Sequence, residues 1–248
     1  MLKIKFYGVR GVYPHGGEQM NSAVVTTESG PFLVDLGSPL IFEDMELMAR
    51  LDHTLITHHH PDHIAFLASL IISRLAIVQD SDGEAQPCNF VSPHPVKEHM
   101  EYVGINGIES YTEHIDIPSR WKGVGLSGMV TAHPAVNYAY KISTDKTTLV
   151  FTGDTTYSPE LADFCKGVDM LVVESSFPDD KIDNALRWGH MCPQLTARLL
   201  DEAAPAKTVL NHFVEMEPDD YRRAVIEIAE GEHEIICSHD GMEIEVEP

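Results

Sequence analysis

The segment His53–Ile64 reads HTLITHHHPDHI and gathers five histidines and one aspartate. A folded core would have to give every ring nitrogen a partner, and a loop in water has no need of so much imidazole. Pro61 biases the backbone of His60 toward an extended conformation, so we expect a strand to end there, with Asp62 and His63 in a turn before the next helix. Imidazole and carboxylate ligands together favour zinc, iron or manganese over magnesium or calcium. The segment therefore predicts part of a transition-metal site.

Three later segments share one pattern, in which a hydrophobic strand runs into a potential ligand and then breaks. They are GMVTAHP at His133, TLVFTGDT at Asp154 and KTVLNHF at His212. Strands that end at one edge of a sheet can bring such distant positions together. Within the first segment, His58 and His60 are two residues apart and should leave one face of a strand. The fold must then place all of these side chains around a common point.

Short β-branched runs are followed by helical runs along the chain, and this order favours mixed sheets covered by helices. With 43% hydrophobic and 23% charged residues, the composition is that of an ordinary globular protein, and we expect one domain spanning residues 1–248. Helices are expected at residues 43–51, 64–78, 95–104, 193–204 and 218–231. Strands are expected at residues 2–8, 22–28, 31–37, 53–57, 89–93, 128–133, 138–144, 147–153, 169–175, 207–213, 233–238 and 242–248.

Acidic residues dominate the charge, because 39 Asp and Glu against 17 Lys and Arg give a net charge of −22. Such a field repels polyanions, and no cluster of basic residues interrupts it, so a nucleic-acid partner is not expected. The four cysteines form no C-x-x-C motif, which favours a reducing, cytoplasmic location. The start of the chain lacks the apolar region of a signal peptide, and the run Ile64–Val78 is short for a membrane span. No membrane association is expected.

In chain order, four motifs resemble the metallo-β-lactamase superfamily: T-H-x-H-x-D-H from Thr57, a lone histidine after a strand, G-D-T from Gly153, and L-x-H-F from Leu210. The resemblance covers nearly the whole chain, from FLVDLGS to the closing HDGMEIEV. It implies an α/β fold, a four-layer αββα sandwich of two mixed sheets flanked by helices. The segments GVRGVYPHGGEQMNSAVV, AHPAVNYAYKI, VVESSF and GHMCPQLTARLL are similar to the phosphodiesterase branch, which includes ribonuclease Z.

This resemblance implies a hydrolase with two divalent metal ions, of which zinc is the expected metal and manganese or iron the alternatives. It assigns His58, His60 and His133 to one ion, Asp62, His63 and His212 to the other, and Asp154 as the bridge between them. A hydroxide that bridges the ions would attack the substrate. By the same resemblance Asp62 would also orient the attacking water, and His190 would orient the phosphate or protonate the leaving oxygen.

A small phosphodiester, such as a cyclic nucleotide or a cyclic ribose phosphate, is the predicted substrate. Ribonuclease Z grips transfer RNA with an inserted arm, and the 21 positions from His133 to Asp154 are too few for such an arm. The net charge of −22 would also repel an RNA lying across the surface, whereas the metal ions make the cleft itself locally positive. Whether the chain forms a homodimer is left open.

Two other functions remain open. A lactonase or thioesterase would use the same hydroxide on a carboxylic ester, and a metal-bearing ligand-binding or regulatory protein would show little turnover. A redox role at two irons is less favoured, because those relatives usually carry glutamate where His60 stands.

Several residues near the motifs admit two interpretations. His15 would line the cleft or face solvent, Glu174 would cap a strand end or fix a ligand histidine, and Cys192 would touch substrate or remain an inert buried thiol. Asp35 is expected to hydrogen-bond the metal loop rather than to bind metal. The remaining histidines are assigned mostly to solvent: His59, His94, His99, His114, His233 and His239.

Overall fold

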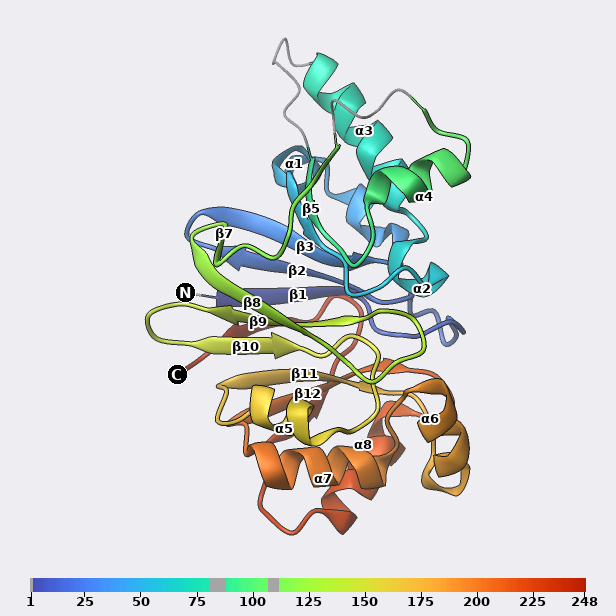
Figure 1. Ribbon diagram of the computed structural model, residues 1–248, viewed down its shortest axis with the longest axis vertical. Coiled ribbons are helices and arrows are strands. Elements are labelled where there is room, and N and C mark those ends of the chain that lie inside the picture. Colours follow the sequence, from blue (N-terminus) through green and yellow to red (C-terminus); the bar gives the residue numbers. More distant parts are fainter. Residues whose placement is uncertain (1, 81–87, 107–111) are drawn as a thin grey trace.

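The structure, a computed structural model, describes residues 2–80, 88–106 and 112–248. Two seven-stranded sheets face each other, and helices cover the outer face of each (Figure 1). Both sheets contain parallel and antiparallel strand pairs, so both are mixed. The predicted four-layer α/β sandwich is therefore confirmed.

The first sheet has the strand order β14-β1-β2-β3-β4-β5-β6. Leu2, Ile4 and Phe6 alternate along β1 and are fully buried. Because alternate side chains of a strand point to the same face, these residues place one face of the sheet on the central core. The strands are β1 (Leu2–Gly8), β2 (Ser22–Thr27), β3 (Gly30–Leu36), β4 (His53–Leu55), β5 (Cys88–Val91), β6 (Thr112–His114) and β14 (Glu243–Val246).

The second sheet has the order β13-β12-β11-β10-β9-β8-β7. Its interior strand β11 reads MLVVES and is buried along its whole length, as expected for a strand with parallel neighbours and helices outside. The strands are β7 (Arg120–Trp121), β8 (Val124–Val130), β9 (Tyr138–Ser143), β10 (Thr148–Phe151), β11 (Met170–Ser175), β12 (Lys207–Phe213) and β13 (Ile235–Cys237).

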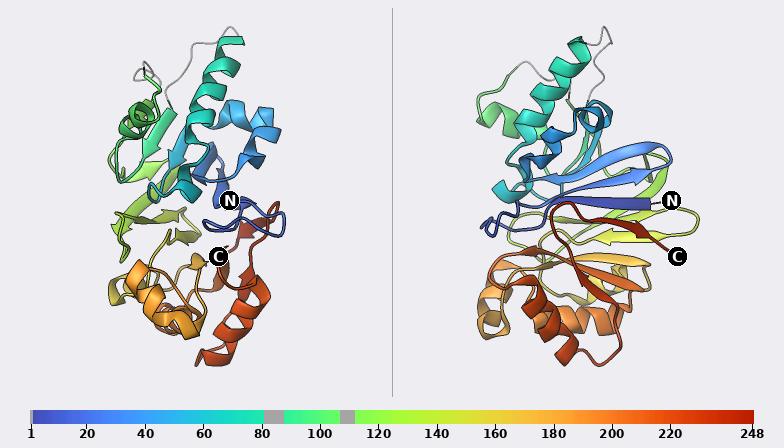
Figure 2. Two further views of the ribbon diagram at one scale, coloured as in Figure 1. Left: turned by 90° about the vertical axis from the view of Figure 1, so that its right-hand side faces the viewer. Right: turned by 180° about the vertical axis from the view of Figure 1, so that it is seen from behind.

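Helices form the two outer layers, as the views in Figure 2 show from the side and from behind. Pro193 and Pro218 stand in the first turns of α7 and α8, where a missing N–H costs nothing, as predicted. The first sheet is covered by η1 (Pro39–Glu43), α1 (Met45–Arg50), α2 (Pro61–Ile64), α3 (Leu67–Asp80) and α4 (Val96–Tyr102). The second is covered by α5 (Pro159–Phe164), η3 (Asp179–Lys181), α6 (Ile182–Trp188), α7 (Pro193–Ala203) and α8 (Pro218–Ile228).

The chain after His60 departs from the prediction. Asp62 and His63 lie inside the short helix α2, not in a turn, because Pro61 already starts the helix. The single helix expected at residues 64–78 is two helices, with a break before Leu67 where the Phe66 N–H donates to the carbonyl of Leu36.

The strand expected to run into His133 is also displaced. It is β8, which begins earlier and ends at Val130, and His133 lies in the following loop, where its N–H donates to Thr131 O. The short helices α5 and α6 and the strands β6 and β7 were not predicted, because elements of so few residues show little periodicity.

One edge of the sandwich collects the ends of β3, β4, β10 and β12, the strands that lead into the predicted ligands. At this edge, hydrogen bonds join the two sheets. Asn211 Nδ2 donates to Asn21 Oδ1 at 2.7 Å, and the Tyr138 N–H donates to Thr57 O at 2.9 Å. Within the described residues, no helix combines the length and apolar character needed to cross a membrane.

Tyr140 makes a further connection between the sheets. Its side chain is fully buried on β9, and its hydroxyl donates to Ile56 O at 2.8 Å and contacts Val91 O at 3.3 Å on the opposite sheet. A phenol in a dry core needs such a partner. This bond therefore fixes the chain two residues before His58.

We expect Tyr140→Phe to lower the free energy of unfolding by about 1–3 kcal/mol, because it leaves a buried carbonyl without its donor. Urea denaturation would measure the change. Tyr138→Phe is the control, since this neighbour on the same strand is only half-buried. An unchanged midpoint for Tyr140→Phe would show that the hydroxyl does not hold the sheets together.

Candidate metal centre

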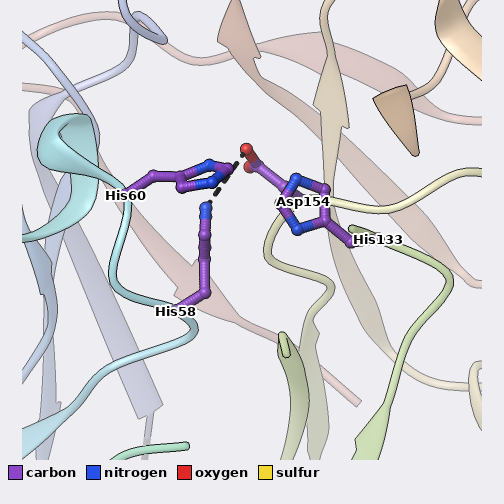
Figure 3. A group of neighbouring side chains, drawn as sticks. All are labelled: His58, His60, His133 and Asp154. Atoms are coloured by element: carbon purple, nitrogen blue, oxygen red, sulfur yellow. Dashed lines mark ion pairs between the residues drawn. The ribbon is translucent and has the colours of Figure 1, made fainter. Parts of the chain in front are cut away.

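His58, His60, His133 and Asp154 point toward one another across the edge of the sandwich (Figure 3). Each offers one ligand atom, and these atoms all lie within 4.8 Å of one another. The ring centroids of His58 and His60 are 4.5 Å apart, and those of His60 and His133 are 5.0 Å apart. Such spacing fits several imidazoles around one ion at about 2.0–2.1 Å from each nitrogen.

A second group contains Asp62, His63, His212 and again Asp154, all of them buried. His212 Nε2 lies 3.1 Å from Asp62 Oδ2 and 3.4 Å from Asp154 Oδ1. His63 Nε2 lies 3.3 Å from the same Asp154 oxygen. The structure thus brings all seven predicted ligands into two adjoining groups that share one carboxylate.

Unsatisfied polar atoms show that the two groups fit metal ions. His58 Nε2, His63 Nε2 and Asp154 Oδ1 are buried atoms without a hydrogen-bond partner. Leaving such atoms unpaired costs about 1–3 kcal/mol each, more for a charged group. Divalent cations between these atoms would satisfy all three. The donor set of imidazoles and carboxylates is also the chemistry that zinc, manganese and iron accept.

Hydrogen bonds on the outer nitrogens set the direction of three rings. His63 Nδ1 donates to Asp35 Oδ2 at 2.7 Å, and His133 Nδ1 donates to Ala135 O at 3.1 Å. His212 Nδ1 donates to Ser176 Oγ at 3.1 Å. Because Nδ1 carries the proton in each case, the lone pair of Nε2 is left facing the centre of the site.

Asp35 is the anchor of the histidine segment. Besides His63, its carboxylate accepts from the Thr57 N–H and from Thr57 Oγ1, both at 2.8 Å, and from Asn21 at 3.2 Å. The prediction that Asp35 supports the metal loop agrees with these bonds. Asp35 has φ +56° and His212 has φ +57°, a left-handed conformation that costs a non-glycine residue energy. Both residues lie where a strand enters the site.

Asn137 positions Asp154. Its side chain donates to Thr152 O at 3.0 Å and accepts from the Asp154 N–H at 3.3 Å. Gly153 has φ +59°, and a Cβ there would meet Asn137 at 2.4 Å, so only glycine lets the loop come this close. The turn therefore presents the Asp154 carboxylate between the two histidine groups.

The pKa values report the electric field at this point. Burial lowers the pKa of His58 and of His133. Burial alone would also lower the pKa of His63 and of His212, but the nearby carboxylates, Asp154 first, raise both instead. The pKa of Asp154 is lowered despite burial, because the imidazoles of His212, His63 and His58 surround it. Negative potential is thus concentrated where the two groups meet.

His190 stands beside the two groups. Its Nδ1 donates to Glu174 Oε1 at 2.8 Å and lies 3.9 Å from Asp154 Oδ2. Burial would lower the pKa of His190, but Glu174 and Asp154 raise it to about 9. Glu174 also accepts from the Thr155 N–H at 2.8 Å and from Ser176 Oγ. Glu174 thus bonds a backbone N–H and His190, which is outside the predicted ligand set, and it reaches the predicted ligand His212 only through Ser176.

The predictions for the residues outside the ligand set had mixed outcomes. His59 points away from the metal groups, but it is half-buried and bonds Ser92 at 2.6 Å, so its assignment to solvent was wrong. His233 was also misassigned, because it bonds Asp201 at 2.8 Å with little exposure. Cys192 is fully buried, and burial raises the pKa of its thiol to about 12, which agrees with an inert thiol. His15 is exposed and bonds Glu217.

Four supporting residues were missed by the sequence analysis: Asn21, Thr57, Asn137 and Ser176. Each is a small polar residue within or beside a motif that was noticed for another residue. No sequence pattern marks them, because the need of a buried polar side chain for a specific partner shows only once the fold has buried it.

Comparison with known proteins identifies the family. The model of the beta-lactamase superfamily domain matches residues 37–213, and the chain therefore belongs to the β-lactamase superfamily. The predicted class, a metal-dependent hydrolase, is confirmed at this level. The chain is similar to the probable metallo-hydrolase YhfI of Bacillus subtilis, with 23% identity over 214 residues, 86% of this chain and 87% of that protein.

Solved structures share the fold. The crystal structure of Bacillus subtilis YhfI has a TM-score of 0.83 at 22% identity, with 98% of each chain covered. Human tRNase Z, short form, has a TM-score of 0.75 at 18% identity, covering 98% of this chain and 99% of that one. A diphosphatase from the PhnP family has a TM-score of 0.74 at 15% identity, covering 99% and 98%.

We expect Asp35→Asn to weaken metal binding about 10–100-fold, because the amide no longer holds the proton on His63 Nδ1. Competition with a chromogenic chelator would measure the affinity. The matched control is Asp52→Asn, which removes a half-buried carboxylate at the opposite end of β4, where it pairs with Lys122. Equal metal affinity in the two variants would contradict an orienting role for Asp35.

Proposed function

We propose that this chain is a dinuclear-metal phosphodiesterase that cleaves a small phosphodiester. The observation that carries the proposal is the pair of ligand groups that share Asp154, with His190 and its partner Glu174 beside them. We assign His58, His60 and His133 to one ion and Asp62, His63 and His212 to the other. Residues 1–248 would act as one catalytic domain.

Divalent ions at these two positions would lower the pKa of a shared water to roughly 7 and bind the oxygens of an in-line displacement. Zinc is the metal that we favour, with manganese or iron as alternatives. The protein supplies the hydrogen bonds that orient the ligands. Asp35, Ser176 and the Ala135 carbonyl hold ring protons outward, so that ligand nitrogens are preorganised. Asp62, which would also orient the attacking water, has its Oδ2 atom 3.1 Å from His212 Nε2 in the same ligand group.

His190 is the residue that we assign to the leaving group. Its Nδ1 is occupied by Glu174, so Nε2 carries the second proton of the imidazolium and can donate it. Burial lowers the pKa of His190, but the Glu174 carboxylate bonded to Nδ1 raises it and so favours the protonated ring. An acid of this kind is needed when the leaving oxygen is an alkoxide, which leaves poorly without a proton.

Charge favours a small diester over RNA. The net charge of −22 would repel each phosphate of a polyanion that lies across the surface. A small anion inside the cleft is screened from most of that charge, because fields fall off over about 8 Å at physiological salt. The relatives support phosphorus chemistry in general, since they include a tRNase Z and a diphosphatase. A cyclic nucleotide or cyclic ribose phosphate suits the assigned proton donor.

A metal-loaded sample should be tested against bis(p-nitrophenyl) phosphate, 2′,3′-cyclic nucleotides, a lactone and thioester panel, and a transfer RNA precursor. We expect the small diesters to turn over fastest. Faster ester cleavage would make the chain a carboxylic ester hydrolase. Tight binding of cyclic nucleotides without turnover would instead make it a metal-bearing binding protein.

We expect Asp154→Ala to lose one or both metal equivalents and more than about a hundredfold in diesterase activity, because two cations would face each other without the shared anion. Elemental analysis after gel filtration would count the metal, and His94→Ala is the control at an exposed histidine. Full metal content with normal turnover would contradict the shared role of Asp154.

We expect His190→Gln to keep its metal and to lose about 10²–10⁴-fold in kcat on a 2′,3′-cyclic nucleotide, whose leaving group is an alkoxide. The loss on bis(p-nitrophenyl) phosphate should be much smaller, because p-nitrophenolate leaves without a proton. Comparing kcat for the two substrates checks the assignment. Equal losses on both would point to phosphate binding rather than proton donation.

A further inference from the structure

Large hydrophobic side chains are exposed on three segments around the metal centre. The exposed fractions are 65% for Tyr13 and 52% for Trp188, and between 43% and 51% for their neighbours. Scattered exposed apolar residues need no explanation, but a group beside a catalytic cleft marks a binding surface. We call this group the rim: Val12, Tyr13, Val136, Leu186 and Trp188.

One part of the rim starts at the second ligand group. Gly11 lies directly against the imidazole of His212, because a Cβ at Gly11 would be 2.7 Å from Cε1 and 3.0 Å from Nε2 of that ring. Val12 and Tyr13 follow at once in the chain. The Tyr13 ring is thus two residues from a backbone that touches a proposed metal ligand.

The other part of the rim starts at the first ligand group. Gly189 packs on the backbone of His133, since a Cβ at Gly189 would be 2.7 Å from the His133 Cα. Trp188 precedes this glycine at the end of α6, and Val136 lies in the loop that follows His133. Figures 1 and 2 show the loop after β1 and helix α6 at the same end of the sandwich. Tyr13 and Trp188 thus belong to two segments, one in backbone contact with each of the two ligand groups.

Ion pairs of the buried Arg10 side chain with partly exposed glutamates hold the Tyr13 loop in place. Arg10 is 3% exposed, and its guanidinium donates to Glu18 at 2.7 Å and to Glu217 at 3.3 Å. Glu217 also contacts His15 Nε2 at 3.3 Å, and His15 Nδ1 donates to the Tyr13 carbonyl at 2.9 Å. The ring is thus presented from an anchored backbone, which reduces the entropy lost when a ligand binds.

We propose that Tyr13 and Trp188 bind the organic group of the substrate by stacking, so that the preferred diester carries a nucleobase or another flat aromatic group. This inference rests on the proposed function and names its specificity. Aromatic side chains stack on any base, and such contacts change affinity about tenfold or more. Arg187 lies over the Trp188 ring at 5.1 Å, a cation that suits a ligand with a phosphate nearby.

Two diesters with the same leaving group test the proposal: thymidine 5′-(p-nitrophenyl phosphate) and methyl p-nitrophenyl phosphate. Because the leaving group is shared, the ratio of their kcat/KM values reports recognition of the nucleoside alone. We expect Tyr13→Ala and Trp188→Ala each to lower this ratio about tenfold, mainly through KM for the thymidine diester. Tyr102→Ala, at a 90% exposed tyrosine on α4, is the matched control and should leave the ratio unchanged.

The outcomes separate the two proposals. If the metal-loaded wild-type protein cleaves neither diester, the proposed function fails. If it cleaves both and the ratio is the same in wild type, Tyr13→Ala and Trp188→Ala, the phosphodiesterase stands and the rim proposal is overturned. A rim variant that changes a dimer into a monomer, with the ratio unchanged, would likewise overturn it and make the rim a protein interface.

Fluorescence gives a readout that needs no turnover. The chain has two tryptophans, of which Trp121 is 3% exposed in the core and Trp188 is 52% exposed. Titration of the metal-loaded protein with thymidine 5′-phosphate should quench the emission of Trp188, and methyl phosphate should not. The quenching should disappear in Trp188→Phe. Equal quenching by both phosphates would overturn stacking on Trp188.

Discussion

The buried carboxylate of Asp154 is the constraint on which the site depends. It is 2% exposed and belongs to each group of potential ligands found in the described part of the chain. A buried charge is costly unless opposite charge surrounds it. The groups that lower the pKa of Asp154 are the imidazoles of His212, His63 and His58. The same arrangement creates a point of negative potential for cations. The burial that would destabilise Asp154 alone is thus also what would attract metal ions to the proposed site.

The sandwich makes this arrangement by bringing strand ends from both sheets to one edge. The first sheet supplies Asp35 and the histidine segment, and the second supplies Asp154 and His212. Asp35 and His212 both adopt positive φ, a strain of order 1–3 kcal/mol each that persists only where neighbours fix the backbone. Bonds across the edge, such as Asn211 to Asn21, provide that support. The fold therefore tolerates local backbone strain that positions side chains at the site.

The strand and helix patterns predicted mixed sheets covered by helices, and the resemblance to the metallo-β-lactamase superfamily supplied the four-layer sandwich and the set of seven candidate ligands. The sequence was less informative about local structure. Asp62 and His63 were placed in a turn, but Pro61 starts α2 and both residues lie within this helix. His133 was placed at a strand end, but lies in the loop after β8. The supporting residues Asn137 and Ser176 were missed, since a single asparagine or serine has no pattern until the fold shows which polar group it meets.

Glu174 explains how one site can hold both metal ligands and a proton donor. One of its oxygens accepts from His190 Nδ1, and the other accepts from Ser176, which in turn accepts from His212. The imidazoles of His190 and His212 have ring centroids 6.1 Å apart and stack at 15°. A single buried carboxylate thus orients both the ring of the proposed proton donor His190 and, through Ser176, the ring of the proposed metal ligand His212. Because both are fixed through Nδ1, the difference between them arises from what each Nε2 faces, and not from the way each is held.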